Sequence, residues 1–108
     1  MAEQEFVIVL TTWPADGEVK DVGRKLVLEQ LAACVNVMPP MFSIYRWQGR
    51  VEEAPEHQLL IKTPRACLGA LQSRLQELHP YEVPEFLVLG VSDGSEAYLR
   101  WIRESVGT

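Results

Sequence analysis

The sequence predicts an α+β domain of the ferredoxin-like type, in which a split β-α-β pattern places helices on one face of an antiparallel sheet. Three observations lead to this prediction. Strand-like and helix-like periodicities follow one another in the order β-α-β-β-α-β, with a short C-terminal helix. The 108 residues fit one domain, 1–108. No internal repeat, linker or low-complexity segment divides the chain.

The first strand and helix are predicted from two contrasting periodicities. Residues 5–13, EFVIVLTTW, are rich in β-branched and aromatic side chains and nearly continuously apolar, which is typical of a central strand. Residues 16–33 repeat apolar side chains at helical spacing, so a helix is expected there. Asp16 is the expected cap for its first N–H groups.

A long β-hairpin is predicted next. Residues 34–50 alternate like a strand but are interrupted at Pro39-Pro40, where a bend or bulge is expected. Ser43, Tyr45 and Trp47 then share one face. Gln48-Gly49 is the expected turn, because glycine tolerates positive φ. The return strand covers 51–63, with its proline-containing first half at an edge.

The last part of the chain predicts a helix, a strand and a short helix. Thr63-Pro64 is typical of a helix start, and the leucine stripe that follows runs to Leu78. His79-Pro80 ends this helix, because the residue before a proline avoids the α region. Residues 84–92 form the last predicted strand, and 95–104 the C-terminal helix.

The predicted strands are apolar on both faces, which predicts self-association. Val7 and Val9 point opposite to Ile8 and Leu10, and the other apolar strands repeat this pattern. Two helices cover only one face of such a sheet, so the other face needs a partner. A second copy of the chain is the simplest one, and we expect a homo-oligomer in which the projecting hairpin pairs with a neighbour.

Composition excludes several classes of protein. The chain is 47% hydrophobic, and its 15 acidic residues against 10 basic ones give a net charge of −5, which argues against nucleic acid as a partner. No apolar run is long enough to span a bilayer, and the acidic start MAEQE does not look like a signal peptide. With two cysteines and no CxxC, a cytoplasmic protein with reduced thiols is expected.

Five segments, in order along almost the whole chain, resemble the CutA family, the divalent-cation tolerance proteins. They are LAACVNVMP (31–39), SIYRWQGRVEE (43–53), LLIKT (59–63), HPYEVPE (79–85) and YLRWIRE (98–104). The resemblance implies a ferredoxin-like subunit and a homotrimer that exchanges long hairpins. It also implies an architecture related to the PII signalling proteins, and a role linked to copper and other divalent cations without an established catalytic reaction.

His79 is the candidate metal ligand, for Cu(II) or another divalent cation, because a neutral imidazole binds such ions. In some bacterial relatives copper is associated with a cysteine at the end of the first strand and a histidine pair before the Pro-Tyr. Here those positions hold Thr11 and Leu78-His79, so one histidine of the set remains. The alternative interpretation is that His79 ends a helix and interacts with its C-terminus.

A small-molecule cleft between subunits is the second candidate site. Mixed apolar and polar side chains are typical of such sites, and the candidates are Lys62, Tyr81, Glu82, Glu85, Trp47 and Trp101. For the aromatic members we favour the alternative interpretation, packing at an interface. The lysine is also typical of a site that holds an anion. Nothing in the sequence matches a nucleophile elbow, P-loop or GxGxxG, so catalysis is not expected.

Overall fold

The computed structural model describes residues 4–107 and confirms the α+β fold with an antiparallel sheet. Each of its elements corresponds to one that the sequence predicts, apart from a single turn of 3₁₀ helix before the second helix. The elements are β1 (Phe6–Pro14), α1 (Val19–Leu28), β2 (Cys34–Val37), β3 (Met41–Trp47), β4 (Arg50–Pro64), the 3₁₀ turn η1 (Arg65–Cys67), α2 (Leu68–Leu78), β5 (Leu87–Gly90) and α3 (Glu96–Ser105).

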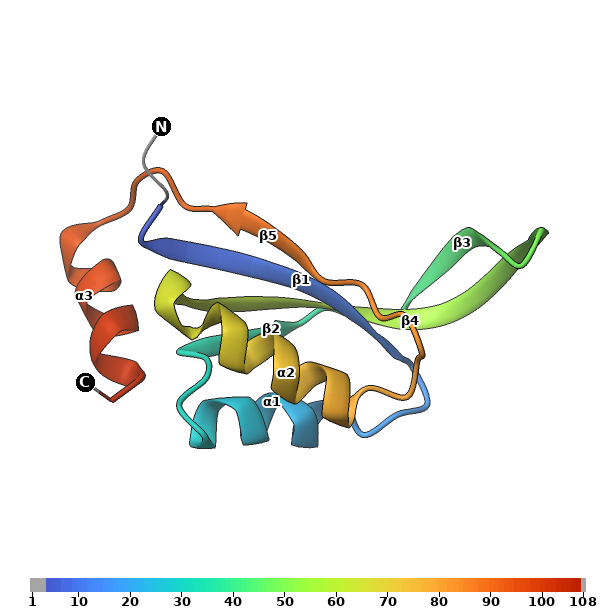
Figure 1. The fold of residues 1–108 in the computed structure, drawn as a ribbon, viewed down its shortest axis with the longest axis horizontal. Helices are drawn as coiled ribbons and strands as arrows, with labels where there is room; N and C mark the ends of the chain where they lie inside the picture. Colours follow the sequence, from blue (N-terminus) through green and yellow to red (C-terminus); the bar gives the residue numbers. More distant parts are fainter. Residues whose placement is uncertain (1–3, 108) are drawn as a thin grey trace.

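The strands form one sheet in the order β2-β4-β1-β5, and every pairing is antiparallel. The 15-residue strand β4 serves two purposes. Its second half lies between β1 and β2, and its first half pairs with β3 in a hairpin that projects from the sheet (Figure 1). The hairpin turns at Gln48 and Gly49, whose φ angles of 50° and 80° confirm the predicted tight turn.

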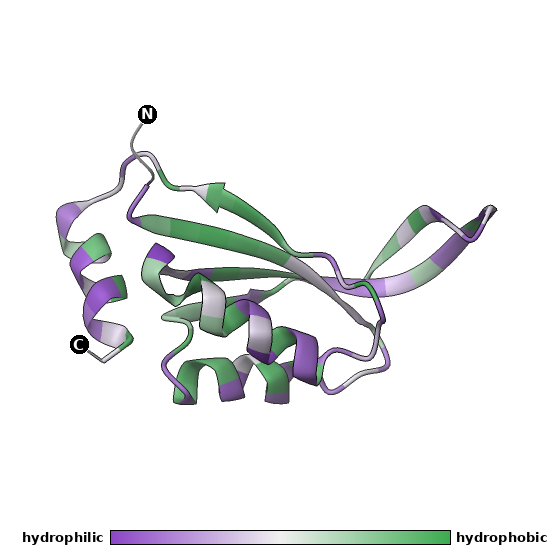
Figure 2. Cartoon of the chain, in the orientation of Figure 1, coloured by the Kyte–Doolittle hydropathy of each residue, from purple (hydrophilic) through white to green (hydrophobic). Residues whose placement is uncertain are grey.

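Helices α1 and α2 lie on one face of the sheet, and the main core is between them and the central strands (Figure 1). The alternation of side chains explains this, because every second residue of β1 and β4 points toward the helices. Figure 2 shows long hydrophobic runs in β1, in β5 and in the second half of β4. The fully buried members of this core include Val7, Val9, Leu26, Leu59, Ile61 and Leu71.

The other face of the sheet stays apolar and largely open. In the register of the sheet, Ile8 lies opposite Leu89, and Leu10 lies opposite both Leu60 and Leu87. Leu89 is 50% exposed, and Leu87 is also exposed. Helix α3 packs at one end only, where Ile102 joins a small second core. We call Ile8, Leu10, Leu60, Leu87 and Leu89 the open apolar face.

Two predicted helix starts are wrong by several residues. The helix expected over 16–33 covers only Val19–Leu28, and Glu18, not Asp16, is its N-cap residue. The helix expected from Thr63-Pro64 begins at Leu68. Thr63 continues β4 opposite Val7, and its hydroxyl donates to the Leu31 carbonyl, so it caps no helix.

The C-terminal elements differ less from expectation. The strand expected over 84–92 is reduced to Leu87–Gly90, the residues that pair with β1. The predicted C-terminal helix is confirmed as Glu96–Ser105, and Ser95 Oγ accepts a hydrogen bond from the Tyr98 N–H at 3.2 Å. Within residues 4–107, every helix is too short or too polar to cross a bilayer.

Candidate functional site

The HPYEVPE segment forms a loop that is held to β1 through the His79 ring. His79 is 8% exposed. Its Nε2 lies 2.6 Å from the Thr12 carbonyl oxygen, and its Nδ1 lies 3.0 Å from the Tyr81 backbone nitrogen. A carbonyl only accepts and an N–H only donates, so Nε2 carries the proton and Nδ1 is the acceptor. The ring is therefore a neutral imidazole that uses both nitrogens.

Two aromatic rings pack against this imidazole. Ring centroids are 4.2 Å apart for Trp13 and His79, and 4.7 Å apart for His79 and Tyr81. Burial lowers the pKa of His79 below its ordinary value, while the Thr12 carbonyl and the Glu56 carboxylate act in the opposite direction. The packing thus favours the same neutral form that the two hydrogen bonds require.

A further hydrogen bond joins the loop to the hairpin. The Tyr81 hydroxyl donates to Glu56 Oε2 at 2.6 Å, a short bond typical of a carboxylate acceptor. Glu56 lies on β4 and is only 5% exposed. Burial raises the pKa of the Tyr81 hydroxyl above its ordinary value, and the bond to Glu56 adds to the effect. Tyr81 is therefore a protonated donor near neutral pH.

The loop and the hairpin enclose a cleft of about 660 Å³. The β3 side chains Met41, Ser43, Tyr45 and Trp47 form one wall, which confirms the predicted sharing of one face by the last three. The remaining lining comes from β1, β4 and the loop: Thr12, Glu56, Pro80, Tyr81, Glu82, Val83, Pro84 and Glu85. Three of the lining residues are glutamates and none is a lysine, arginine or histidine, so the cleft is acidic.

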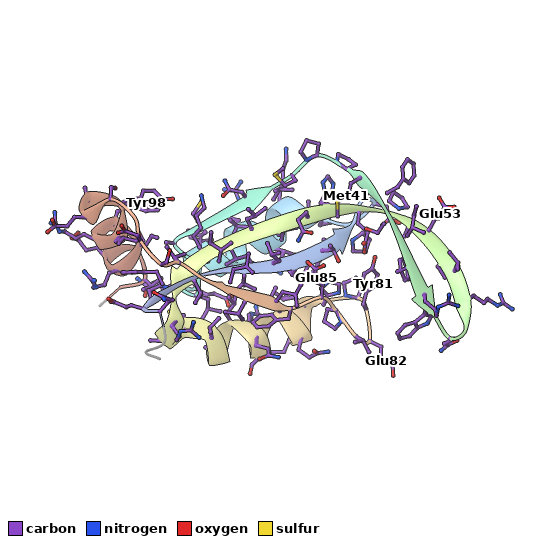
Figure 3. The ribbon with its side chains drawn as sticks, turned by 90° about the horizontal axis from the view of Figure 1, so that it is seen from above. Met41, Glu53, Tyr81, Glu82, Glu85 and Tyr98 are labelled. Carbon is purple, nitrogen blue, oxygen red and sulfur yellow. The ribbon has the colours of Figure 1, made fainter. Side chains whose placement is uncertain are left out.

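Two of the loop carboxylates differ in their surroundings. Glu85 Oε2 accepts a hydrogen bond from Gln58 Nε2 at 2.9 Å, which fixes it over the sheet. Glu82 is exposed and projects from the outer tip of the loop, whereas Tyr81 and Glu85 lie further in (Figure 3). Glu85 therefore offers a positioned carboxylate, and Glu82 offers an exposed one.

The predicted cleft residues fall into two groups within one chain. Tyr81, Glu82, Glu85 and Trp47 line the cleft together. Lys62 instead lies near α3, with its Nζ 5.8 Å from the centroid of the Tyr98 ring. Trp101 belongs to this second group, because its ring centroid is 5.4 Å from that of Tyr98. Figure 3 shows Tyr98 at one end of the molecule and Tyr81 well away from it, toward the hairpin, so one chain does not bring the two groups together.

Comparison with known proteins decides the family. Residues 7–105 match the family model described as "CutA1 divalent ion tolerance protein". The chain belongs to the CutA1 family. It is 45% identical to the "Divalent-cation tolerance protein CutA" of Thermus thermophilus, over 93% of this chain and 97% of that protein. It is 41% identical to human "Protein CutA", over 86% of this chain and 52% of that protein.

Solved CutA1 structures agree with the fold. The CutA1 structure from Shewanella sp. SIB1 superimposes with a TM-score of 0.94 at 30% identity, covering 99% of this chain and 100% of that one. The structure of the Thermus thermophilus protein gives a TM-score of 0.90 at 44% identity, covering 94% and 99%. The projecting hairpin and the three helices are thus part of the CutA1 architecture.

Thr11 and Leu78-His79 occupy the positions at which the resemblance implies metal ligands in some relatives. Thr11 is 1% exposed. Val9 and Trp13, each two residues from Thr11 along β1, belong to the core on the helix side of the sheet, so Thr11 points to that side as well. A metal ion at His79 would have to displace one of its two hydrogen bonds. Within residues 4–107, no group of three or more His, Cys, Asp and Glu side chains is arranged to hold a metal ion. The geometry gives no support to His79 as a ligand in the isolated CutA1 chain.

Glu56 and Tyr45 are among the cleft residues that sequence reasoning missed. Pairing explains both: Glu56 lies opposite Met41 across the hairpin, and Tyr45 lies two residues from Trp47. The hairpin register could have identified Glu56, because counting residues outward from the Gln48-Gly49 turn along both strands places Glu56 opposite Met41. Its burial by Tyr81 depends on the loop, which no local pattern encodes.

Proposed function

We propose that this chain acts in divalent-cation tolerance as a cytoplasmic homotrimer that binds Cu(II) or a similar ion weakly in its acidic cleft. The observation that carries the proposal is the charge of the cleft, which has three glutamates and no basic side chain. Carboxylate oxygens suit hard divalent cations, and copper prefers imidazole or thiolate. With His79 engaged elsewhere, weak binding through Glu82 and Glu85 follows.

The open apolar face supports the assembly. Side chains alternate along β1 and β4, so Thr12 and Glu56 of the cleft share their face with Leu10 and Leu60. Copies that cover this face would meet beside the cleft, and Lys62 and Trp101 of one copy would be free to approach it in another. The resemblance implies three copies, and the free Cys34 and Cys67 support a reducing compartment.

Calorimetric titration with Cu(II) and Mn(II) tests the ion site. We expect both ions to bind the native protein weakly, and the double variant Glu82→Gln, Glu85→Gln to lose at least tenfold in affinity. Glu53→Gln is the matched control, because Glu53 lies opposite Ile44 on the other face of the hairpin. Equal loss in the control, or a native protein that binds neither ion at millimolar concentration, contradicts the proposal.

His79→Gln separates the carboxylates from the imidazole. Glutamine keeps one donor and one acceptor for the Thr12 carbonyl and the Tyr81 N–H. If the carboxylates hold the ion, Cu(II) affinity in this variant stays within twofold of the native value. A tenfold loss would instead assign the ion to His79 and show that the ring gives up one hydrogen bond on binding.

A second candidate function is that of a PII-like trimeric module that binds a small molecule at the subunit boundary. The observation that favours it is the size of the cleft, about 660 Å³ with aromatic walls, which falls in the range of small-molecule sites. A ligand that binds only the folded protein raises its melting temperature by mass action. A thermal-shift screen of nucleotides, organic anions and organic cations tests this, and a screen without any hit contradicts it.

A further inference from the structure

Glu56 is a buried carboxyl group with an incomplete set of partners. It is 5% exposed and its Oε2 accepts the Tyr81 hydroxyl, but no salt bridge reaches it from residues 4–107. Taking a carboxylate out of water is costly unless a cation or several donors compensate. Its neighbour His79 does not supply this charge, because its two hydrogen bonds require the neutral ring. The cleft that Glu56 lines therefore lacks a positive charge.

Aromatic faces surround the same space. Trp47 and Tyr45 stand on one wall with large exposed fractions of 41% and 43%, and Tyr81 stands on the other. Tryptophan and tyrosine rings attract a cation held over their faces. Met41 and Val83 add apolar surface that suits an alkyl stem. This combination of a buried carboxyl and aromatic walls is the chemistry that recognises an organic cation.

We propose that the cleft binds a small organic cation that carries N–H donors, a guanidinium or primary ammonium on an apolar body. Its N–H groups reach Glu56, its charge lies against Tyr45 and Trp47, and its body packs on Met41 and Val83. This proposal rests on the proposed function in one respect: the organic cation occupies the same cleft in which the proposed function places a divalent ion. A bare metal ion leaves the aromatic walls unused, and a quaternary ammonium leaves Glu56 without a donor.

Butylguanidinium and butylurea are matched probes, because both carry a planar head group of similar shape on the same butyl chain but only the first is charged. Calorimetry on the assembled native protein should show butylguanidinium binding at least tenfold more tightly than butylurea. Glu56→Gln should reduce this preference to threefold or less, because an amide retains the Tyr81 contact but not the charge. Glu53→Gln makes the same charge change on the opposite face of the hairpin and should leave the preference intact.

A second variant keeps the test decisive if Glu56→Gln does not fold. Trp47→Leu preserves apolar contact but removes the ring, and should lower the affinity for butylguanidinium at least fivefold with little effect on butylurea. Equal binding of the two probes, no binding of either, or equal losses in Glu53→Gln and Glu56→Gln would overturn the proposal.

Failure of this inference is distinguishable from failure of the proposed function. Light scattering and Mn(II) titration on the same preparations report assembly and ion binding without the organic probe. A trimer that binds Mn(II) but not butylguanidinium overturns the inference alone. Selective binding of butylguanidinium by a protein that binds neither Mn(II) nor Cu(II) supports the inference and removes the divalent ion from the cleft.

Discussion

The hydroxyl of Tyr81 and the carboxyl of Glu56 meet at 2.6 Å, and this bond closes the loop onto the hairpin. The two residues are 25 positions apart in sequence and come from the loop before β5 and from β4. The same loop is also fixed at its start by His79, whose Nε2–H donates to the Thr12 carbonyl. One buried and one partly buried hydrogen bond thus hold the loop that lines the cleft.

Tyr81→Phe tests the first of these bonds. The variant leaves the Glu56 carboxyl buried without its donor, so we expect it to lower the free energy of unfolding by about 1.5–3 kcal/mol. Tyr45→Phe is the control, because that hydroxyl lies on the exposed wall of the same cleft and should cost less than about 0.5 kcal/mol. Chemical denaturation at pH 7 measures both, and equal effects would show that the bond contributes nothing specific.

His79 makes the folded protein sensitive to mild acid. Burial lowers its pKa below the ordinary 6.5, so below pH 6.5 the unfolded chain binds a proton that the folded chain does not. Stability should therefore be level above pH 6.5, fall as the pH drops below it, and level again below the folded pKa. Denaturation from pH 8 to 5 should show this contribution in native protein and lose it in His79→Gln.

The control for this pH dependence is the other histidine. His57 is partly exposed on β4, with Nδ1 2.8 Å from the Met38 carbonyl oxygen. His57→Gln should keep the acid sensitivity of the native protein. If His57→Gln abolishes the sensitivity and His79→Gln retains it, the assignment to the buried ring is wrong.

Local sequence predicts which helices and strands form better than it predicts the residues at which they begin and end. Gln48-Gly49 and Ser95 are sufficient to predict the hairpin turn and the α3 start, because each acts through its own backbone neighbours. Thr63 leads to the wrong start for α2, because threonine is common in strands as well as at helix N-caps. Its hydroxyl finds the Leu31 carbonyl, a partner that no local pattern reveals.

The site is less predictable, because its contacts join distant segments. His79 has the chemistry of a metal ligand in any sequence, but the Thr12 carbonyl 67 positions away takes one of its nitrogens. Lys62 and Tyr81 both have the chemistry of a ligand site, but they lie near different parts of β4. Lys62 is close to Tyr98 of α3, whereas Tyr81 lines the cleft beside Glu56. Only an assembly of copies would bring such groups together, and the sequence pattern of one chain does not predict contacts between copies.

Two buried threonines should respond oppositely to the same substitution. Within the described residues, Thr11 Oγ1 is buried without a hydrogen-bond partner, whereas Thr63 Oγ1 donates to the Leu31 carbonyl at 2.8 Å. Thr11→Val removes an unsatisfied hydroxyl and should stabilise the fold by about 1 kcal/mol. Thr63→Val breaks a bond and should destabilise it by about 1–3 kcal/mol. Denaturation midpoints that move in the same direction would contradict this account.

A single charge on the open apolar face should disrupt assembly. Leu89 is 50% exposed beside Ile8 in the sheet, so each copy gains about 1 kcal/mol when a neighbour covers it. Leu89→Asp forfeits this gain in every copy and also places a carboxylate in the interface, so we expect association to weaken roughly 100-fold or more. Leu28→Asp is the matched control, because Leu28 is exposed at the end of α1 on the opposite side of the sheet. Sedimentation velocity at micromolar concentration should show a trimer for the native protein and for Leu28→Asp, and smaller species for Leu89→Asp. A native monomer, or a Leu89→Asp trimer as stable as the native one, would show that the assembly does not use this face.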